Sequence, residues 1–170
     1  MMLPIRPVRD DDAQDLFGLV ALCFAEYPGC FVDPHDDLGD LLEPARAYGR
    51  TGGRFWLLED QRGRACACVA VGFPEPKLAE LHRLYVRPDQ RRRGMGEALI
   101  LTAEHFAREA GAKRLVFWSD TRFTIAHRLY ARLGFAQSGE ERQLGDISQS
   151  REYFFKKDLA GQEGASGDSP

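Results

Sequence analysis

The sequence predicts an α/β (α+β) protein with one domain, in which about four helices flank a mixed central sheet of about six to seven strands. Amphipathic segments with helical periodicity alternate with short apolar runs, and glycines or prolines separate many of them. The length of 170 residues suits a single domain, and no internal repeat divides it. We expect this domain to cover residues 1–159, followed by a disordered tail at residues 160–170, which lack large apolar side chains.

Four amphipathic segments predict the helices. They run from near Asp10 to about Tyr27, from Asp33 toward Tyr48, from about Gly94 to Glu109, and from Phe123 to Leu133. In the first, the apolar residues recur every three or four positions and the chain then reaches Pro28 and Gly29. Gly111 and Gly134 follow the last two segments, as expected for helix C-termini.

Short runs of apolar and β-branched residues predict the strands. They cover Leu3–Arg6, Phe55–Glu59, Ala65–Phe73, Ala79–Val86, Leu115–Trp118 and Glu152–Lys156. The second and third are joined by a four-residue connection with Gly63 near its end, which is typical of a hairpin. Cys66 and Cys68 lie two positions apart in one strand, so strict alternation would place them on one face as small core residues.

Composition and charge exclude several classes of function. The 23 basic and 26 acidic residues leave a formal net charge of -3, which favours neither nucleic acid nor an anionic membrane as a partner. The longest apolar runs, Leu16–Ala25 and Ala65–Val71, are shorter than the roughly 20 residues that span a bilayer. The N-terminus lacks the features of an export signal, so we expect a soluble, cytoplasmic protein.

The four cysteines point to the same compartment. They are too few for a disulfide framework in a chain of this size and lack the spacing of metal ligands. We therefore expect reduced thiols and no bound metal.

The segment Leu81–Gly96 has the anatomy of an anion site. A strand is followed by a loop with Arg91, Arg92 and Arg93, then by Gly94 and Gly96 at the start of a helix. Unpaired N–H groups and the dipole at a helix N-terminus attract phosphate, and arginines add charge-assisted hydrogen bonds. The P-loop pattern is absent because no Lys-Ser or Lys-Thr follows, and Leu99 breaks the dinucleotide pattern. A nucleotide-binding protein of either type is therefore not expected.

Two blocks of this sequence resemble the GNAT N-acetyltransferase superfamily. Arg91-x-x-Gly94-x-Gly96 after a strand resembles the acetyl-CoA pyrophosphate motif of that family. Residues 126–135, Ala-His-Arg-Leu-Tyr-Ala-Arg-Leu-Gly-Phe, resemble its later helix, with the expected tyrosine and the Gly-Phe ending. With the hairpin and the final strand included, the resemblance covers roughly Ile5 to Lys157.

The resemblance implies a single GNAT-like domain that uses acetyl-CoA as acyl donor and needs no metal. The backbone of Leu84, Tyr85 and Val86 would run alongside the pantetheine arm, as an added strand would. The pyrophosphate would be held by the loop and helix start, that is, by Arg91, Arg92, Arg93, Gly94, Met95 and Gly96.

Candidate catalytic groups follow from the same resemblance. Glu80 is placed like the catalytic glutamate of some family members, and Tyr130 matches the tyrosine that protonates the leaving thiolate. Alternation would put Glu80, His82, Leu84 and Val86 on one face of their strand. His82 and a chain of waters remain alternatives for the base.

The sequence departs from the family at Phe123, where the family often has asparagine, so a side-chain contact to coenzyme or strand is in doubt there. Ser119, Asp120 or Thr121 are the candidates to replace it.

The acceptor region is acidic. Asp33, Asp36, Asp37, Asp40 and Glu43 attract a cationic amine or form a solvated face, and Asp146, Ser148, Ser150 and Glu152 line the pocket or form a polar loop. The leading hypothesis is an N-acetyltransferase acting on a small primary amine by direct attack in a ternary complex, in a monomer or a homodimer. The alternatives are a catalytically silent acyl-CoA-binding regulatory module and an acetyltransferase for a protein N-terminus or lysine.

Overall fold

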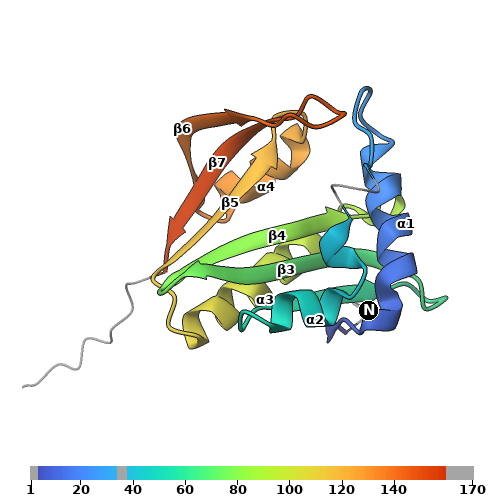
Figure 1. Cartoon of the computed structure of the whole chain (residues 1–170), viewed down its shortest axis with the longest axis horizontal. Helices are drawn as coiled ribbons and strands as arrows, with labels where there is room; N and C mark the ends of the chain where they lie inside the picture. Colours follow the sequence, from blue (N-terminus) through green and yellow to red (C-terminus); the bar gives the residue numbers. More distant parts are fainter. Residues whose placement is uncertain (1–3, 34–37, 160–170) are drawn as a thin grey trace, which may run out of the picture.

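The computed structural model describes residues 4–33 and 38–159, and over these residues the chain forms a seven-stranded mixed sheet flanked by four α-helices (Figure 1). The strands are β1 (Arg6–Pro7), β2 (Arg54–Glu59), β3 (Ala65–Glu75), β4 (Leu78–Val86), β5 (Arg114–Asp120), β6 (Ala136–Gln143) and β7 (Arg151–Asp158). The helices are α1 (Ala13–Phe24), α2 (Pro44–Gly49), α3 (Met95–Glu109) and α4 (Thr124–Arg132). The predicted α/β class is confirmed; the tail expected at 160–170 lies outside the described residues.

The sheet is antiparallel except at its centre. Its strand order is β1-β2-β3-β4-β5-β7-β6, and only β4 and β5 run parallel. These two strands pair over Leu78–Glu80 alone, against residues 114–116, and then diverge, as Figure 1 shows. Beyond Glu80, one edge of β4 is therefore not paired with a neighbouring strand of the described chain.

Two layers of helices bury the two faces of the sheet. Helices α1 and α2 cover one face, where Leu16, Leu19 and Val20 meet Phe55 and Leu57. Helices α3 and α4 cover the other, where Leu99, Ile100 and Ala103 pack against alternate residues of the central strands. This agrees with the apolar stripe that the sequence shows on each long helix.

A β-bulge changes the predicted alternation along β4. Its register against β3 shifts between Cys68 and Ala70, and Arg83 adopts a left-handed conformation with φ of 53°. As a result His82 lies near Tyr48 on the α1/α2 face, whereas Leu84 and Val86 pack into the α3/α4 core. The prediction that Glu80, His82, Leu84 and Val86 share a face was therefore wrong, because one extra residue inverts the alternation.

A second register shift separates Cys66 from Cys68. It lies between Leu58 and Glu59 of β2, opposite the start of β3. The Cys66 Sγ contacts the Met95 Sδ at 3.9 Å on the α3 side, whereas the Cys68 Sγ donates to the Arg83 carbonyl at 3.1 Å on the other. The expectation of a shared face was wrong, but Cys66 and Cys68 are both buried in the core, as expected, and no disulfide forms among the cysteines of the described residues.

Three element boundaries differ from the sequence-based expectation. The second helix is only α2, preceded by a 3-10 turn at Gly39–Leu41, because Pro44 suits the first turn of a helix but not its interior. The first strand is reduced to Arg6–Pro7, and Leu3 lies outside the described residues. Strand β6 was not identified individually, because its side chains are nearly all polar and exposed. None of the helices in 4–33 and 38–159 has the length and apolarity to cross a membrane.

Candidate active site

Two cavities meet at the diverging end of β4. One, of about 520 Å³, lies between β4, the arginine loop and the starts of α3 and α4; we call it the cradle cavity. The other, of about 640 Å³, lies between β4, α2 and the ends of β5, β6 and β7; we call it the polar cavity. Leu84, Tyr85 and Phe123 line both, so the unpaired segment of β4 forms the boundary between them.

The start of α3 forms the floor of the cradle cavity. Gly94 has φ of 75°, a conformation that glycine adopts without strain, and its carbonyl accepts the first helical hydrogen bond, from the Ala98 N–H. The N–H groups of residues 95–97 precede that bond and have no partner within the helix. A Cβ at Gly96 would lie 3.1 Å from Leu129 Cδ2 and 3.6 Å from Val86 Cγ2, so any larger residue would have to displace Leu129 by a few tenths of an ångström.

The three arginines of the loop differ in their surroundings. Arg91 lines the cradle cavity; its Nε donates to the Val86 carbonyl at 3.1 Å, and its Nη2 lies 2.5 Å from a carboxylate oxygen of Glu26. Arg92 also lines the cavity and is exposed, with φ of 61°. Arg93 is exposed but does not line the cavity. Of the three arginines predicted to hold the pyrophosphate, Arg91 and Arg92 therefore line the cradle cavity.

The buried part of the cradle is apolar. Met95 is buried and contacts Cys66, while Leu84 and Val86 pack against the α3/α4 core. Tyr85 packs toward the opposite face, with its ring 5.9 Å from that of Phe24. Their backbone therefore runs along the cavity while their side chains anchor β4 on both faces of the sheet.

Glu80 and His82 project into the polar cavity from β4. The His82 Nε2 lies 3.8 Å from a carboxylate oxygen of Glu80. Burial lowers the pKa of His82 despite the nearby carboxylates, so the imidazole is neutral at pH 7. Glu80 is consequently not neutralised by its neighbour.

The bulge residue Arg83 belongs to a buried hydrogen-bonded group on the same wall. Its Nε and Nη2 donate to Asp40 at 3.1 and 2.6 Å, and the Tyr48 hydroxyl donates to Asp40 at 2.6 Å. Burial opposes ionisation of Asp40, but the hydrogen bonds from Arg83 and Tyr48 keep its pKa low. This group fixes β4 to the segment before α2, and it was not predicted.

Tyr130 lies in α4 and also lines the polar cavity. Its ring packs against Phe117, Phe135 and Phe155, and burial raises the pKa of its hydroxyl to about 12. The phenol is therefore protonated at neutral pH, as a general acid must be. Beside it, the Ser119 hydroxyl lies 3.1 Å from His127 Nε2, a contact that the sequence did not suggest.

Phe123 occupies the junction of the two cavities. Its ring lies 4.9 Å from that of Tyr27 and 6.3 Å from that of Phe24, so it bridges α1 and the start of α4. Among the predicted substitutes for the missing asparagine, Ser119 contacts His127 and Asp120 pairs with Arg122. None of the three lines the cradle cavity, so Phe123 itself is the contact that this segment offers there.

The acidic and polar residues predicted around the acceptor separate into two groups. Asp40, Asp146, Ser150 and Glu152 line the polar cavity. Glu43 pairs with Arg46 outside it, Asp33 does not line it, and Asp36 and Asp37 lie outside the described residues. Ser148 instead ties two loops together, because its hydroxyl accepts from the Phe31 N–H and donates to the Phe31 carbonyl.

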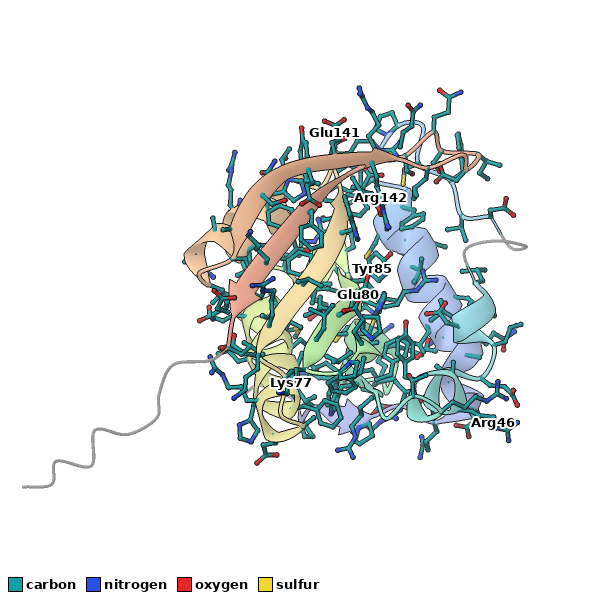
Figure 2. All side chains as sticks on the ribbon, turned by 60° about the vertical axis from the view of Figure 1, so that its left-hand side comes forward. Arg46, Lys77, Glu80, Tyr85, Glu141 and Arg142 are labelled. Carbon is teal, nitrogen blue, oxygen red and sulfur yellow. The ribbon has the colours of Figure 1, made fainter. Side chains whose placement is uncertain are left out.

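One further charged group in the polar cavity was missed. Arg142 of β6 lies with its guanidinium carbon 4.3 Å from the centre of the Trp118 ring. Figure 2 shows it near the end of β6, with Glu80 and Tyr85 on β4. In the sequence, Arg142 lies in a run of mostly polar residues. Such a run does not distinguish a strand from a loop, so it did not identify Arg142 as a residue of the site.

Comparison with known proteins places the chain among acetyltransferases. The sequence profile of the acetyltransferase (GNAT) family matches residues 18–135, more than half of the chain. An uncharacterized N-acetyltransferase of Schizosaccharomyces pombe is 36% identical over 99 residues, covering 56% of this chain and 60% of the relative. Human N-acetyltransferase 8 is 28% identical over 106 residues, covering 59% and 47%. The chain thus spans about half the length of these relatives.

Solved structures show the same fold. The Salmonella typhimurium protein yncA, solved with its cofactor acetyl-CoA, superposes with a TM-score of 0.75 at 18% identity and covers 100% of both chains. The paia N-acetyltransferase from Thermoplasma acidophilum, in complex with coenzyme A, has a TM-score of 0.72 at 17% identity, covering 93% of this chain and 99% of its own.

Proposed function

The chain belongs to the acetyltransferase (GNAT) family, and we propose that it transfers an acetyl group from acetyl-CoA to a primary amine of a small molecule. The observation that carries the proposal is the meeting of two cavities at the unpaired edge of β4. One cavity offers an anion site at a helix N-terminus, and the other offers a carboxylate and a protonated tyrosine. Donor and acceptor can therefore approach the same strand from opposite sides and form a ternary complex.

The cradle cavity fits the phosphate end of acetyl-CoA. The N–H groups at the start of α3, with Arg91 and Arg92 beside them, would hold the pyrophosphate. Gly94 and Gly96 line this cavity and add no side chain to it. Acetyl-CoA supplies the activated acyl group, and the backbone of residues 84–86 would align its extended arm as an added strand.

The polar cavity would receive the amine. Glu80 would take a proton from the attacking amine, with His82 or water as the alternative route, as the new C–N bond forms. The C–S bond of the thioester breaks, and the Tyr130 hydroxyl would give its proton to the departing sulfur. The apolar surroundings of Tyr130 keep that hydroxyl protonated until the thiolate forms.

Coenzyme binding is tested with a matched pair of glycine variants. Gly94 and Gly63 have φ of 75° and 73°, and a Cβ at either meets nothing within 4 Å, so a substitution strains the backbone equally at both. Gly94→Glu places a carboxylate in the cradle, whereas Gly63→Glu places it in the β2–β3 turn. Calorimetry should show loss of acetyl-CoA binding in the first variant alone; equal affinity in both variants would reject the cradle.

Transfer itself is tested by release of free thiol from acetyl-CoA across amino acids, polyamines, aminoglycosides and short peptides. Turnover with a small amine supports the proposal. Turnover with peptides alone would favour the protein-directed alternative, and tight coenzyme binding without turnover would favour the silent module. The presence of Glu80 and Tyr130 on one cavity counts against the silent module.

A further inference from the structure

The polar cavity is lined by five carboxylates, and four of them have partners in the described structure. The four pairings are Asp40 with Arg83, Asp120 with Arg122, Glu152 with Arg142, and Asp146 with the N–H and hydroxyl of Ser150. Paired charges of this kind shape a cavity but contribute little net field to it. Three of the five carboxylates are paired in this way with an arginine within the described structure.

Glu80 is the exception. Its recorded ionic neighbour is His82, at 3.8 Å, and that imidazole is neutral at pH 7. Glu80 thus provides, at the β4 wall of the cavity, a carboxylate whose neighbour carries no charge, whereas the other carboxylate without an arginine partner among the described residues, Asp146, is held by the N–H and hydroxyl of Ser150. This wall would attract the ammonium form of an amine and then accept its proton.

Arg142 provides a cation whose hydrogen-bonding capacity is only partly used by the protein. Its Nε donates to Glu152 at 2.6 Å and its guanidinium lies over Trp118, so its plane is held from two directions. Its two Nη atoms make no recorded hydrogen bond within residues 4–33 and 38–159. Arg83 differs, because both its Nε and its Nη2 donate to Asp40.

The partly exposed Arg142 side chain also faces the polar cavity. It lines this cavity, as Glu80 and His82 do. Its neighbour Glu141 instead pairs with Arg151 and does not line the cavity. Figure 2 shows Glu141 beside Arg142 on β6, with Glu80 and Tyr85 on β4.

From this arrangement we infer that the acceptor is an amine that also carries a carboxylate, such as an amino acid. The paired Nη atoms of Arg142 bind the carboxylate through charge-assisted hydrogen bonds, and Glu80 holds the amino group at the β4 wall. The inference rests on the proposed function and narrows its substrate class. A carboxylate-free cationic amine would satisfy Glu80 alone and would leave the Arg142 fork unused.

The first test compares each proteinogenic amino acid with its own carboxamide as acceptor, in the thiol-release assay. The pair shares its side chain and its amino group and differs in the anionic group. The amide also has the more acidic ammonium group, so its larger fraction of free amine biases the comparison against our inference. We expect kcat/KM for the preferred amino acid to exceed that for its amide by about 10- to 100-fold.

The second test compares two arginine variants. Arg142→Gln should raise KM for the amino acid by about 10- to 100-fold and leave KM for acetyl-CoA unchanged. Arg151→Gln is the matched control, because Arg151 forms a similar ion pair on the adjacent strand, at 2.9 Å from Glu141, outside the cavity. It should change neither constant.

Each outcome decides between the two proposals. Equal or faster turnover of amides overturns the inference and leaves the transferase intact, as does an Arg142→Gln variant with unchanged KM. Coenzyme binding without turnover of any amino acid also overturns the inference, because the panel then lacks a carboxylate-bearing acceptor. Absence of acetyl-CoA binding in calorimetry overturns the proposed function itself and the inference with it.

Discussion

If Arg91 binds the pyrophosphate as proposed, Glu26 competes with the coenzyme for Arg91, and removing the Glu26 charge should strengthen acetyl-CoA binding. The Arg91 guanidinium lies 2.5 Å from Glu26, and the two side chains are 26% and 31% exposed. An ion pair at this exposure contributes about 0.5 to 1 kcal/mol. If Arg91 leaves Glu26 to bind pyrophosphate, Glu26→Gln should therefore tighten binding by about 2- to 5-fold.

Arg91→Ala should act in the opposite direction. On the same premise, it would remove a charge-assisted hydrogen bond to phosphate, which corresponds to about 10- to 100-fold weaker binding. Both dissociation constants are measured by calorimetry at one ionic strength. Glu43→Gln is the control, because it removes the same charge from an exposed pair with Arg46 at 2.6 Å, away from both cavities. It should leave the affinity unchanged.

The opposite changes in acetyl-CoA affinity distinguish a binding role of Arg91 from a purely structural one. A structural brace between α1 and β4 would be weakened equally from either end, because Arg91 joins Glu26 to the Val86 carbonyl. Equal losses of affinity in Glu26→Gln and Arg91→Ala, accompanied by equal losses in Tm, would therefore refute the assignment of Arg91 to the pyrophosphate. An unchanged affinity in Arg91→Ala would refute it as well.

Four other outcomes are expected. Glu80→Gln should move the pH optimum of kcat/KM to alkaline values, since deprotonation of the amine then depends on solvent; an unchanged profile removes Glu80 from the base role. Tyr130→Phe should lower kcat about 100-fold with little change in coenzyme affinity, and full activity would exclude it as the acid. Gly53→Ala puts a Cβ 2.2 Å from a backbone carbonyl of β3 and should destabilise the fold by about 3 kcal/mol in urea titrations; Gly49→Ala, with open space around it, should change stability little. Burial lowers the pKa of His82, so the unfolded chain binds more protons and unfolding should become easier as pH falls through about 6.5; in His82→Asn that slope should shrink.

The elements that the sequence predicted well are those with a clear apolar pattern. Helices α1 and α3 carry apolar residues at helical spacing, and strands β2 and β3 are short apolar runs buried on both faces of the sheet, so burial and pattern agree. Strand β6 has no such pattern. Its partner β7 and a break in register around Gly139 determine its position, and both are tertiary features that no local pattern records.

The part of the candidate site that lies in local sequence motifs could be predicted from the sequence. The resemblance predicted catalytic roles for Glu80 and Tyr130, and in the structure both residues line the polar cavity. The residues that sequence reasoning missed come from elsewhere in the chain. Arg142 reaches the cavity from β6, and His127 contacts Ser119 across the β5–α4 connection.

The bulge at Arg83 explains why alternation fails where the site is built. A left-handed conformation at a non-glycine residue costs about 1 kcal/mol or more. The two hydrogen bonds from Arg83 to Asp40, supported by Tyr48, offset that cost in a buried setting. The extra residue keeps Glu80 and His82 facing the polar cavity while it turns Leu84 toward the α3/α4 core, beside the cradle. One irregularity thus places Leu84 and Val86 on the face opposite Glu80 and His82, whereas strict alternation would put all four on one face.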